Sequence, residues 1–103
     1  GERILSRKSV ELMSSNLLPD NIKSSDSYIQ GAGFGITVGV VEDPGLLGQY
    51  GSKGMYFWGG AASTIFWIDP EEELVAVAMT QLLASPWPLR ETFSALVYQA
   101  IDD

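Results

Sequence analysis

The sequence predicts an α+β fold in which an antiparallel sheet of about four strands is flanked by an N-terminal and a C-terminal helix. Apolar residues recur at helical spacing near both ends of the chain. Between residues 34 and 81 they alternate with period two or run continuously, and the last three of these runs are joined by connections too short for parallel strands. At 103 residues the chain has the length of one modest domain.

Composition excludes several classes of function. The net charge is −7, from 13 acidic and 6 basic residues, and three of the bases lie in the first eight positions, so we expect no nucleic-acid partner. The longest apolar run, LVAVAM at 74–79, is far below the roughly 18 residues that span a bilayer, so we expect no membrane partner. There is no Cys and no His, which excludes a cysteine nucleophile and a Ser-His-Asp triad built from this chain. We expect no metal and no cofactor, and the localisation stays open.

A short helix is predicted near the N-terminus, in SRKSVELMSSNLLP. Ser6 is a suitable N-cap, Pro19 closes the segment, and one face carries Val10, Met13 and Leu17. The polar, turn-rich residues 20–33 that follow predict a connecting loop.

The first strand is predicted from Phe34 to Val41, where large apolar residues alternate with small ones. The face that carries Gly35 and Gly39 is nearly bare, so a helix or a ligand can pack closely on it, and a helix is favoured. Residues 42–54, EDPGLLGQYGSKG, predict a long turn region.

Three further antiparallel strands are predicted at 53–60, 62–69 and 73–81. The last two are apolar on both faces, which indicates a sheet buried on both sides. The acids after Asp69-Pro70, Glu71 to Glu73, predict a solvated hairpin turn and not a metal site or an acid/base pair. Aromatic residues in and beside the strands are expected in the core and not as a cofactor platform: Phe34, Phe57, Phe66 and Trp67.

A C-terminal helix is predicted after SPWP at 85–88, lying across one face of the sheet. Its apolar stripe consists of Leu89, Phe93, Leu96, Val97, Ala100 and Ile101. Two helices cannot cover both faces of such a sheet, and an edge strand of strong β-formers is left unpaired. The sequence therefore predicts part of a larger fold.

The stretch FWGGAAST at 57–64 places the smallest residues in the course of a strand. Glycine weakens a strand interior and is found there at a bend or where another group approaches closely. Two interpretations remain: a tight hairpin corner or closely crossing helix, or a substrate-facing edge with exposed backbone N–H groups.

The order of these segments resembles the C-terminal part of the serine β-lactamase-like hydrolases, most closely the class C β-lactamases and the family VIII carboxylesterases. The resemblance covers nearly the whole chain and is most specific in WGGAASTIFWIDPEEELVAVAMTQ and GFGITVGVV. It implies that residues 1–103 are a single C-terminal fragment of a β-lactamase-like domain, with the partial fold of that family.

The active site of that family uses an S-x-x-K motif, a Y-x-N motif and a K-T-G motif or variant on a strand that borders the cleft. Trp58-Gly59-Gly60 stands where the third motif belongs. The resemblance implies that Trp58, Gly59, Gly60 and Ala61 bind substrate, with Ala61 N–H as an oxyanion donor. Trp58 in place of the lysine removes a cation that helps to hold a β-lactam carboxylate, so an ester is the expected substrate.

Neither S-x-x-K nor Y-x-N occurs in the sequence, so we expect no catalytic residue in this chain and no activity from it alone. A small-molecule ester or β-lactam would be a substrate only if an N-terminal part completes the site. The alternative is a non-catalytic module or gene remnant that forms homo-oligomers through its exposed sheet edges. Oligomeric state would distinguish the two.

Overall fold

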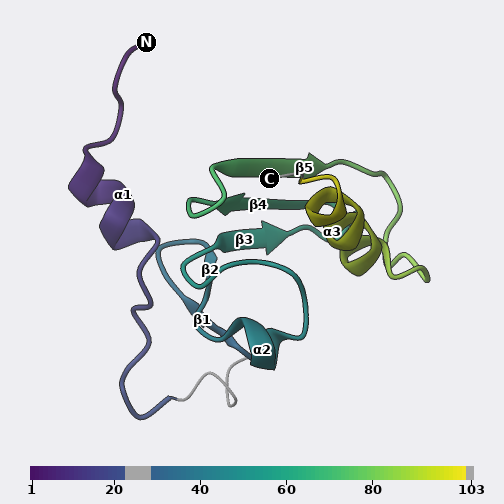
Figure 1. Ribbon diagram of the computed structural model, residues 1–103, viewed down its shortest axis with the longest axis horizontal. Coiled ribbons are helices and arrows are strands. Elements are labelled where there is room, and N and C mark those ends of the chain that lie inside the picture. The colour runs from purple at the N-terminus through teal and green to yellow at the C-terminus, as the bar shows by residue number, and fades with distance from the viewer. Residues whose placement is uncertain (23–28, 102–103) are drawn as a thin grey trace.

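The computed structural model describes residues 1–22 and 29–101, which form one five-stranded sheet with three helices (Figure 1). In chain order the elements are α1 (Arg7–Met13), β1 (Ala32–Phe34), β2 (Gly39–Val41), α2 (Pro44–Leu47), β3 (Tyr56–Gly59), β4 (Ile65–Asp69), β5 (Leu74–Ala78) and α3 (Leu89–Gln99). Neighbouring strands pair antiparallel in the order β1-β2-β3-β4-β5. The α+β prediction is confirmed, with five strands where about four were expected.

The extra strand arises because the predicted strand from Phe34 to Val41 is a hairpin. Gly35 N–H donates to the Val38 carbonyl (2.8 Å), and Thr37 adopts a φ of 68° in the left-handed region. The apolar alternation continues through this two-residue turn, so periodicity alone could not reveal it. The loop prediction for 20–33 is wrong at Ala32 and Gly33, which belong to β1, and residues 23–28 lie outside the described residues.

The other predicted elements have shorter bounds than expected. The three later strands are confirmed at 56–59, 65–69 and 74–78, and the turn region 42–54 also contains α2. The side chain of Asp43 caps α2 by accepting from Leu46 N–H (3.0 Å). Ser6 caps α1 as predicted, accepting from Ser9 N–H, but α1 ends at Met13, so Leu17 is not on its face.

The core lies mainly between the sheet and α3, which crosses one face of the sheet as predicted (Figure 1). The buried residues of this face are Val41, Met55, Trp67 and Ala76, and α3 packs Phe93, Val97 and Tyr98 against them. Leu96 was expected in the helix stripe, but it is 60% exposed. The predicted stripe also ran past the end of α3 at Gln99.

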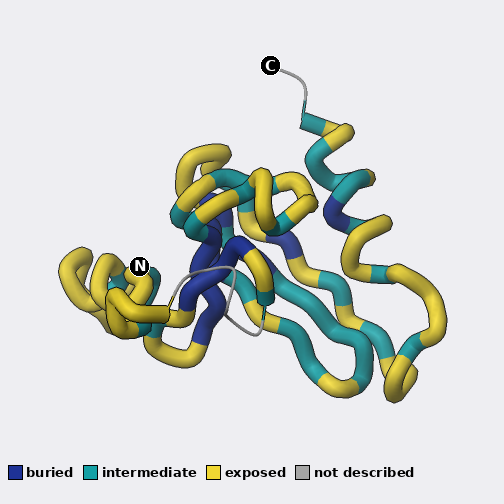
Figure 2. The backbone as a smooth tube through the Cα atoms, turned by 90° about the horizontal axis from the view of Figure 1, so that it is seen from below, coloured by how far each residue is buried: buried dark blue, intermediate teal, exposed yellow. Residues whose placement is uncertain are grey.

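The opposite face of the sheet is only partly covered by the described residues. Val38, Val40 and Tyr56 are buried there, and Met13 of α1 packs beside them. On β5, however, Val75 is 66% and Val77 57% exposed. Figure 2 shows the dark, buried backbone concentrated in one part of the molecule while long stretches elsewhere remain exposed. Burial on both sides was therefore an overestimate for this chain, as was the core placement of Phe34, which is 37% exposed.

The two glycines of the predicted bare face have different neighbours, because the segment is a hairpin. A Cβ atom at Gly39 would lie 2.9 Å from the Phe57 ring, whereas Gly35 meets the end of α1. A Cβ atom at Gly35 would collide with the Met13 carbonyl, and Ile36 N–H donates to that carbonyl (3.0 Å). No helix within the described residues is long and apolar enough to cross a membrane.

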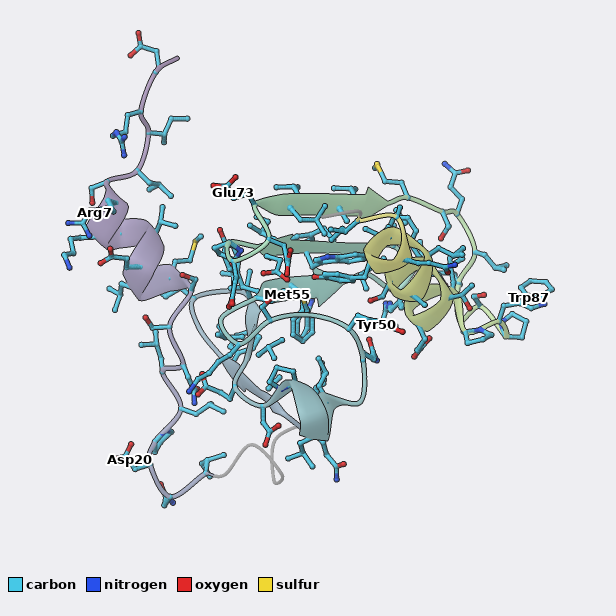
Figure 3. All side chains as sticks on the ribbon, viewed as in Figure 1. Arg7, Asp20, Tyr50, Met55, Glu73 and Trp87 are labelled. Atoms are coloured by element: carbon cyan, nitrogen blue, oxygen red, sulfur yellow. The ribbon has the colours of Figure 1, made fainter. Side chains whose placement is uncertain are left out.

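A buried carboxylate joins three parts of the fold. Asp69 is 0% exposed and accepts hydrogen bonds from the hydroxyls of Ser52 (2.9 Å) and Tyr98 (2.8 Å) and from Glu72 N–H (3.3 Å). The predicted hairpin turn at 70–73 is confirmed, and its three glutamates are exposed. Glu73 marks this turn in Figure 3, and Trp87 marks the exposed loop before α3.

Candidate functional site

The stretch 57–64 forms a tight hairpin corner between β3 and β4. Gly60 N–H donates to the Thr64 carbonyl (3.0 Å), and Ser63 N–H donates to the Gly60 carbonyl (3.1 Å). The segment after β5 closes over the tip, because the Thr80 hydroxyl and Leu82 N–H both donate to the Ala62 carbonyl. The small residues thus form a tight hairpin corner, which confirms the first of the two interpretations of this stretch. The hairpin does not by itself decide whether its edge faces a substrate.

One edge of β3 is unpaired where the predicted site residues lie. β2 pairs with β3 only at Tyr56 and Phe57, whereas β4 pairs with all four residues of β3. Because Gly60 N–H points to β4 and successive residues of a strand point to opposite edges, the peptide groups of Gly59 point to the side where β2 has already ended. Within residues 1–22 and 29–101 no strand occupies that side of Gly59.

Ala61 follows directly on this open edge. Its residue is exposed, and its carbonyl accepts from Ala84 N–H (3.4 Å). Its N–H donates to no group among the described residues. A free backbone donor beside an open strand edge can bind an oxygen atom that carries negative charge.

Arg90 of α3 lies directly over Gly59. Its guanidinium group donates to the carbonyls of Gly60 (3.0 Å) and Thr64 (3.4 Å). A Cβ atom at Gly59 would lie 2.6 Å from Arg90 Cζ, and one at Gly60 would collide with the Thr64 side chain. Sequence reasoning missed Arg90, although it is the only basic residue after Lys53.

Trp58 lies at the rim of the site and not in the core. Its side chain is 40% exposed and packs edge-to-face on Phe34, with ring centroids 5.4 Å apart. Phe34 was assigned to the core from the sequence, but it supports Trp58 on the surface. The pair forms an apolar wall beside the open edge of β3.

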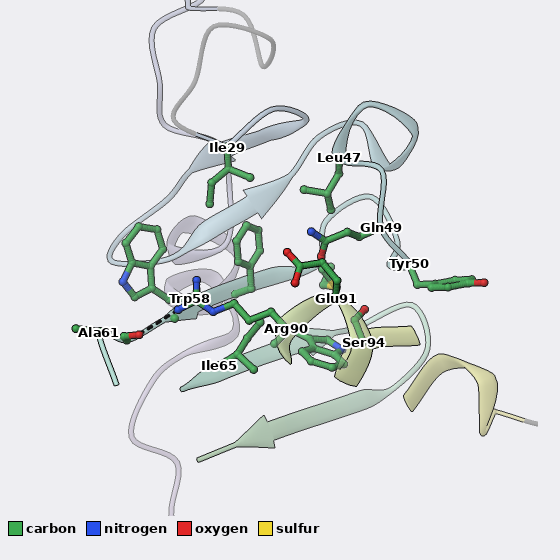
Figure 4. Close-up of a pocket in the computed structure, with 15 residues that line it drawn as sticks. Ile29, Leu47, Gln49, Tyr50, Trp58, Ala61, Ile65, Arg90, Glu91 and Ser94 are labelled. Atoms are coloured by element: carbon green, nitrogen blue, oxygen red, sulfur yellow. Dashed lines mark hydrogen bonds between the residues drawn. The ribbon is translucent and has the colours of Figure 1, made fainter. Parts of the chain in front are cut away.

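A cavity of about 420 Å³ adjoins the hairpin and contains all four predicted site residues, Trp58, Gly59, Gly60 and Ala61, in its lining (Figure 4). Its apolar floor comes from the sheet, α3 contributes Arg90, Glu91 and Ser94, and the loop after α2 contributes Gln49 and Tyr50. Segments that are far apart in sequence thus meet around the hairpin.

The S-x-x-K motif that carries the nucleophilic serine does not occur in this sequence. The Ser63 hydroxyl, at the hairpin tip, donates to the Leu82 carbonyl (2.7 Å) and so holds the loop that covers the tip. With no His in the sequence, none of its serines can be activated in the way of a Ser-His-Asp triad. The arrangement supplies a donor for an oxyanion and room for a substrate.

Comparisons with known proteins identify a family by one family model and find relatives of which this chain covers only a part. A family model described as Beta-lactamase matches residues 1–99. Protein Rv1367c and Uncharacterized protein MT1414, from two strains of Mycobacterium tuberculosis, are each 35% identical over 89 residues, which cover 79% of this chain and 22% of the relative. The solved structure of EstCE1, described as a hydrolase with promiscuous acyltransferase activity, matches with a TM-score of 0.73 and 24% identity over 91% of this chain and 24% of that chain. The chain therefore spans about a quarter or less of the length of these proteins.

Proposed function

The chain belongs to the beta-lactamase family, and from this premise we propose that it forms one wall of the active site of a serine hydrolase that acts through an acyl-serine intermediate. The observation that supports this function is the open edge of β3 followed by the free Ala61 N–H, both beside a cavity. A carbonyl group lying along this edge would place its oxygen within reach of a backbone donor.

In this proposal, a segment outside this chain supplies the serine that carries out the covalent chemistry. A serine oxygen attacks the carbonyl carbon, the carbonyl oxygen becomes an oxyanion, and Ala61 N–H stabilises it. The leaving group then departs, and water hydrolyses the acyl-serine. The chain lacks S-x-x-K and Y-x-N, so it is expected to be inactive alone and to act only when joined to a segment that carries both motifs.

Esters are the proposed substrates in preference to β-lactams. Trp58 supplies an aromatic surface at the position where a lysine would hold a β-lactam carboxylate, and it packs on Phe34. Arg90 is near, but its guanidinium group is already engaged by the carbonyls of Gly60 and Thr64. An uncharged acyl group suits this wall better than a carboxylate.

Labelling with a serine-reactive fluorophosphonate ester tests the function. The chain alone should show no adduct by intact-mass spectrometry, whereas the protein completed with the S-x-x-K segment should gain one adduct per molecule. An adduct on the chain alone would mean that one of its own serines is activated and would contradict the proposal.

The role of Ala61 N–H is tested by Ala61→Pro in the completed protein. Proline removes the N–H and also fixes φ, which is tolerated because proline is favoured at this second position of the β-turn that Ser63 N–H and the Gly60 carbonyl close. We expect kcat to fall by about 10² to 10³. Ala61→Ser keeps the N–H and should retain nearly full activity; equal rates for the two variants would exclude the oxyanion role.

A second candidate function is a non-catalytic module that self-associates. It is favoured by β5, an edge strand on which Val75 and Val77 are exposed. On this candidate the isolated chain should elute from a size-exclusion column as a dimer or larger species. A monomer that nevertheless gains activity when completed would favour the hydrolase.

A further inference from the structure

The cavity beside the hairpin extends away from Ala61 under α3 toward the loop after α2. Its floor is apolar and partly aromatic, with Phe57, Ile65 and Trp67 facing α3. The volume of about 420 Å³ lies within the range of small-molecule sites and is enough for a ring-sized substituent. The end of the cavity near Ala61 is the proposed oxyanion site. The far end, which lies between α3 and the loop after α2, has no ligand in the proposed function.

The two ends of the cavity carry opposite charges. Arg90 directs its guanidinium group over Gly59 toward the hairpin and donates to the Gly60 carbonyl (3.0 Å). Glu91 directs its carboxylate toward Gln49 on the opposite wall (Figure 4). Among the described residues Glu91 forms no ion pair, so its negative charge is uncompensated at the mouth of the far end.

Ser94 lies one helical turn beyond Arg90 and Glu91 and adds a polar group to this end. It is 7% exposed, lines the cavity and turns its hydroxyl toward the loop that carries Gln49 (Figure 4). Its side chain makes no hydrogen bond with the residues that the structure describes. Its hydroxyl is therefore free to bond with a ligand atom or a water molecule in the cavity.

We propose that the far end of the cavity binds an organic ammonium group, and that the preferred ester therefore carries an amine on the part that lies under α3. The Glu91 carboxylate provides the charge, and the Gln49 side-chain oxygen and Ser94 Oγ can accept the remaining ammonium protons. The connecting carbons lie on Phe57, Ile65 and Trp67. The choice of ester as substrate rests on the proposed function, but binding of the ammonium group does not require hydrolysis.

The charges favour a cation over an anion or a neutral polar group. The chain as a whole carries −7, which raises the local concentration of cations and repels anions. Arg90 opposes a cation only near the hairpin, where the carbonyl end of the ester would lie.

Tryptophan fluorescence can measure this binding directly. Trp58 and Trp67 line the cavity, whereas Trp87 is exposed outside it, so the Trp87→Phe chain reports mainly on the site. Three probes of similar size are titrated at neutral pH: 2-phenylethylammonium, 2-phenylethanol and 3-phenylpropionate. We expect the ammonium probe to bind at least about threefold more tightly than the alcohol, and the carboxylate to bind most weakly. High salt should reduce the preference.

Glu91→Gln should abolish the preference by bringing the dissociation constants of the ammonium and alcohol probes to within about 1.5-fold of each other. The matched control is Glu71→Gln, which removes the same charge from the exposed β4–β5 turn and should leave the preference intact. Circular dichroism should show that both variants keep the wild-type secondary structure, since both glutamates are exposed.

Two results would overturn the proposal: equal binding of the three probes to the chain, or an ammonium preference that survives Glu91→Gln. Neither result bears on acyl transfer, which the fluorophosphonate adduct measures separately. Failure of the adduct with a retained ammonium preference would instead leave a cation-binding cavity without hydrolase function.

Discussion

At the scale of single residues, Asp69 and Tyr98 form a buried hydrogen-bonded pair that the sequence pattern did not predict. Asp69-Pro70 correctly predicted a turn, but the glutamates that follow suggested that the whole segment is solvated. The structure buries Asp69 completely, because the hydroxyls of Ser52 and Tyr98 donate to its carboxylate in addition to the local Glu72 N–H. Neither hydroxyl is near Asp69 in sequence, so no local pattern could identify them.

Burial, the hydrogen bond to Asp69 and the charge of Asp69, in that order, raise the pKa of Tyr98 above its ordinary value of about 10. In the unfolded chain the phenol therefore releases its proton at a lower pH than in the folded chain. The Tyr98 contribution to the free energy of unfolding is fully present below about pH 10 and is lost as the pH rises further. Tyr98→Phe should remove this alkaline decline.

Urea unfolding between about pH 8 and pH 12 measures the effect. Tyr98→Phe should be less stable than wild type at neutral pH, because Asp69 loses a hydrogen-bond donor, yet the difference should shrink as the pH rises. A constant difference across the whole range would show that Tyr98 does not cause the decline.

At the scale of elements, the last three strands of the sheet were predictable, whereas the ends of the strands and the β1–β2 hairpin were not. β4 and β5 follow from apolar runs on either side of Asp69-Pro70, and α3 follows from its helical stripe. The β1–β2 hairpin was missed because Thr37, not glycine, occupies the left-handed position of its turn. In the site, the resemblance selected Trp58 to Ala61, but Arg90, Glu91 and Ser94 enter only through the packing of α3 on the sheet.

Arg90 fixes the hairpin relative to α3, and its removal should loosen the hairpin locally. Arg90→Ala deletes the hydrogen bonds to the carbonyls of Gly60 and Thr64. We expect opening of the hairpin to become easier by on the order of 1 kcal/mol, so that the Gly60 amide, bonded to the Thr64 carbonyl, exchanges its hydrogen about fivefold faster.

Hydrogen exchange followed by NMR provides the measurement. Arg3→Ala is the matched control, because it removes the same side chain from an exposed position before α1. Amides in the β4–β5 pair should exchange at the wild-type rate in both variants. Unchanged exchange at Gly60 in Arg90→Ala would show that the hairpin holds its shape without the guanidinium group.

At the scale of the whole molecule, the sheet has one face covered by α3 and another that the described residues cover only in part. β5 ends the sheet with an unpaired edge and carries Val75 and Val77 on the open face. The sequence predicted both features, since two helices were too few for a sheet that is apolar on both faces. What covers this face depends on a partner or on further chain, and neither is encoded in a local pattern.

If copies of the chain pair through β5, a charge on that strand should separate them. Val77→Lys places an ammonium group on the edge strand, where lysine disfavours strand pairing. We expect this variant to elute as a monomer from a size-exclusion column while the wild type elutes as a dimer or larger species. Leu83→Lys adds the same charge to an exposed position after β5 and should elute like wild type; equal elution of all three proteins would argue against pairing through β5.

The strand order has a consequence for how the chain reaches its native state. Each strand pairs with its neighbour in sequence, so every step of sheet assembly closes only a short loop and contact order within the sheet is low. Trp67, by contrast, is covered by Phe93 and Tyr98, which follow all five strands. The aromatic surface of the sheet around Trp67 is therefore covered only after α3 has docked, so docking of α3 removes an exposed apolar surface through which partly folded chains aggregate.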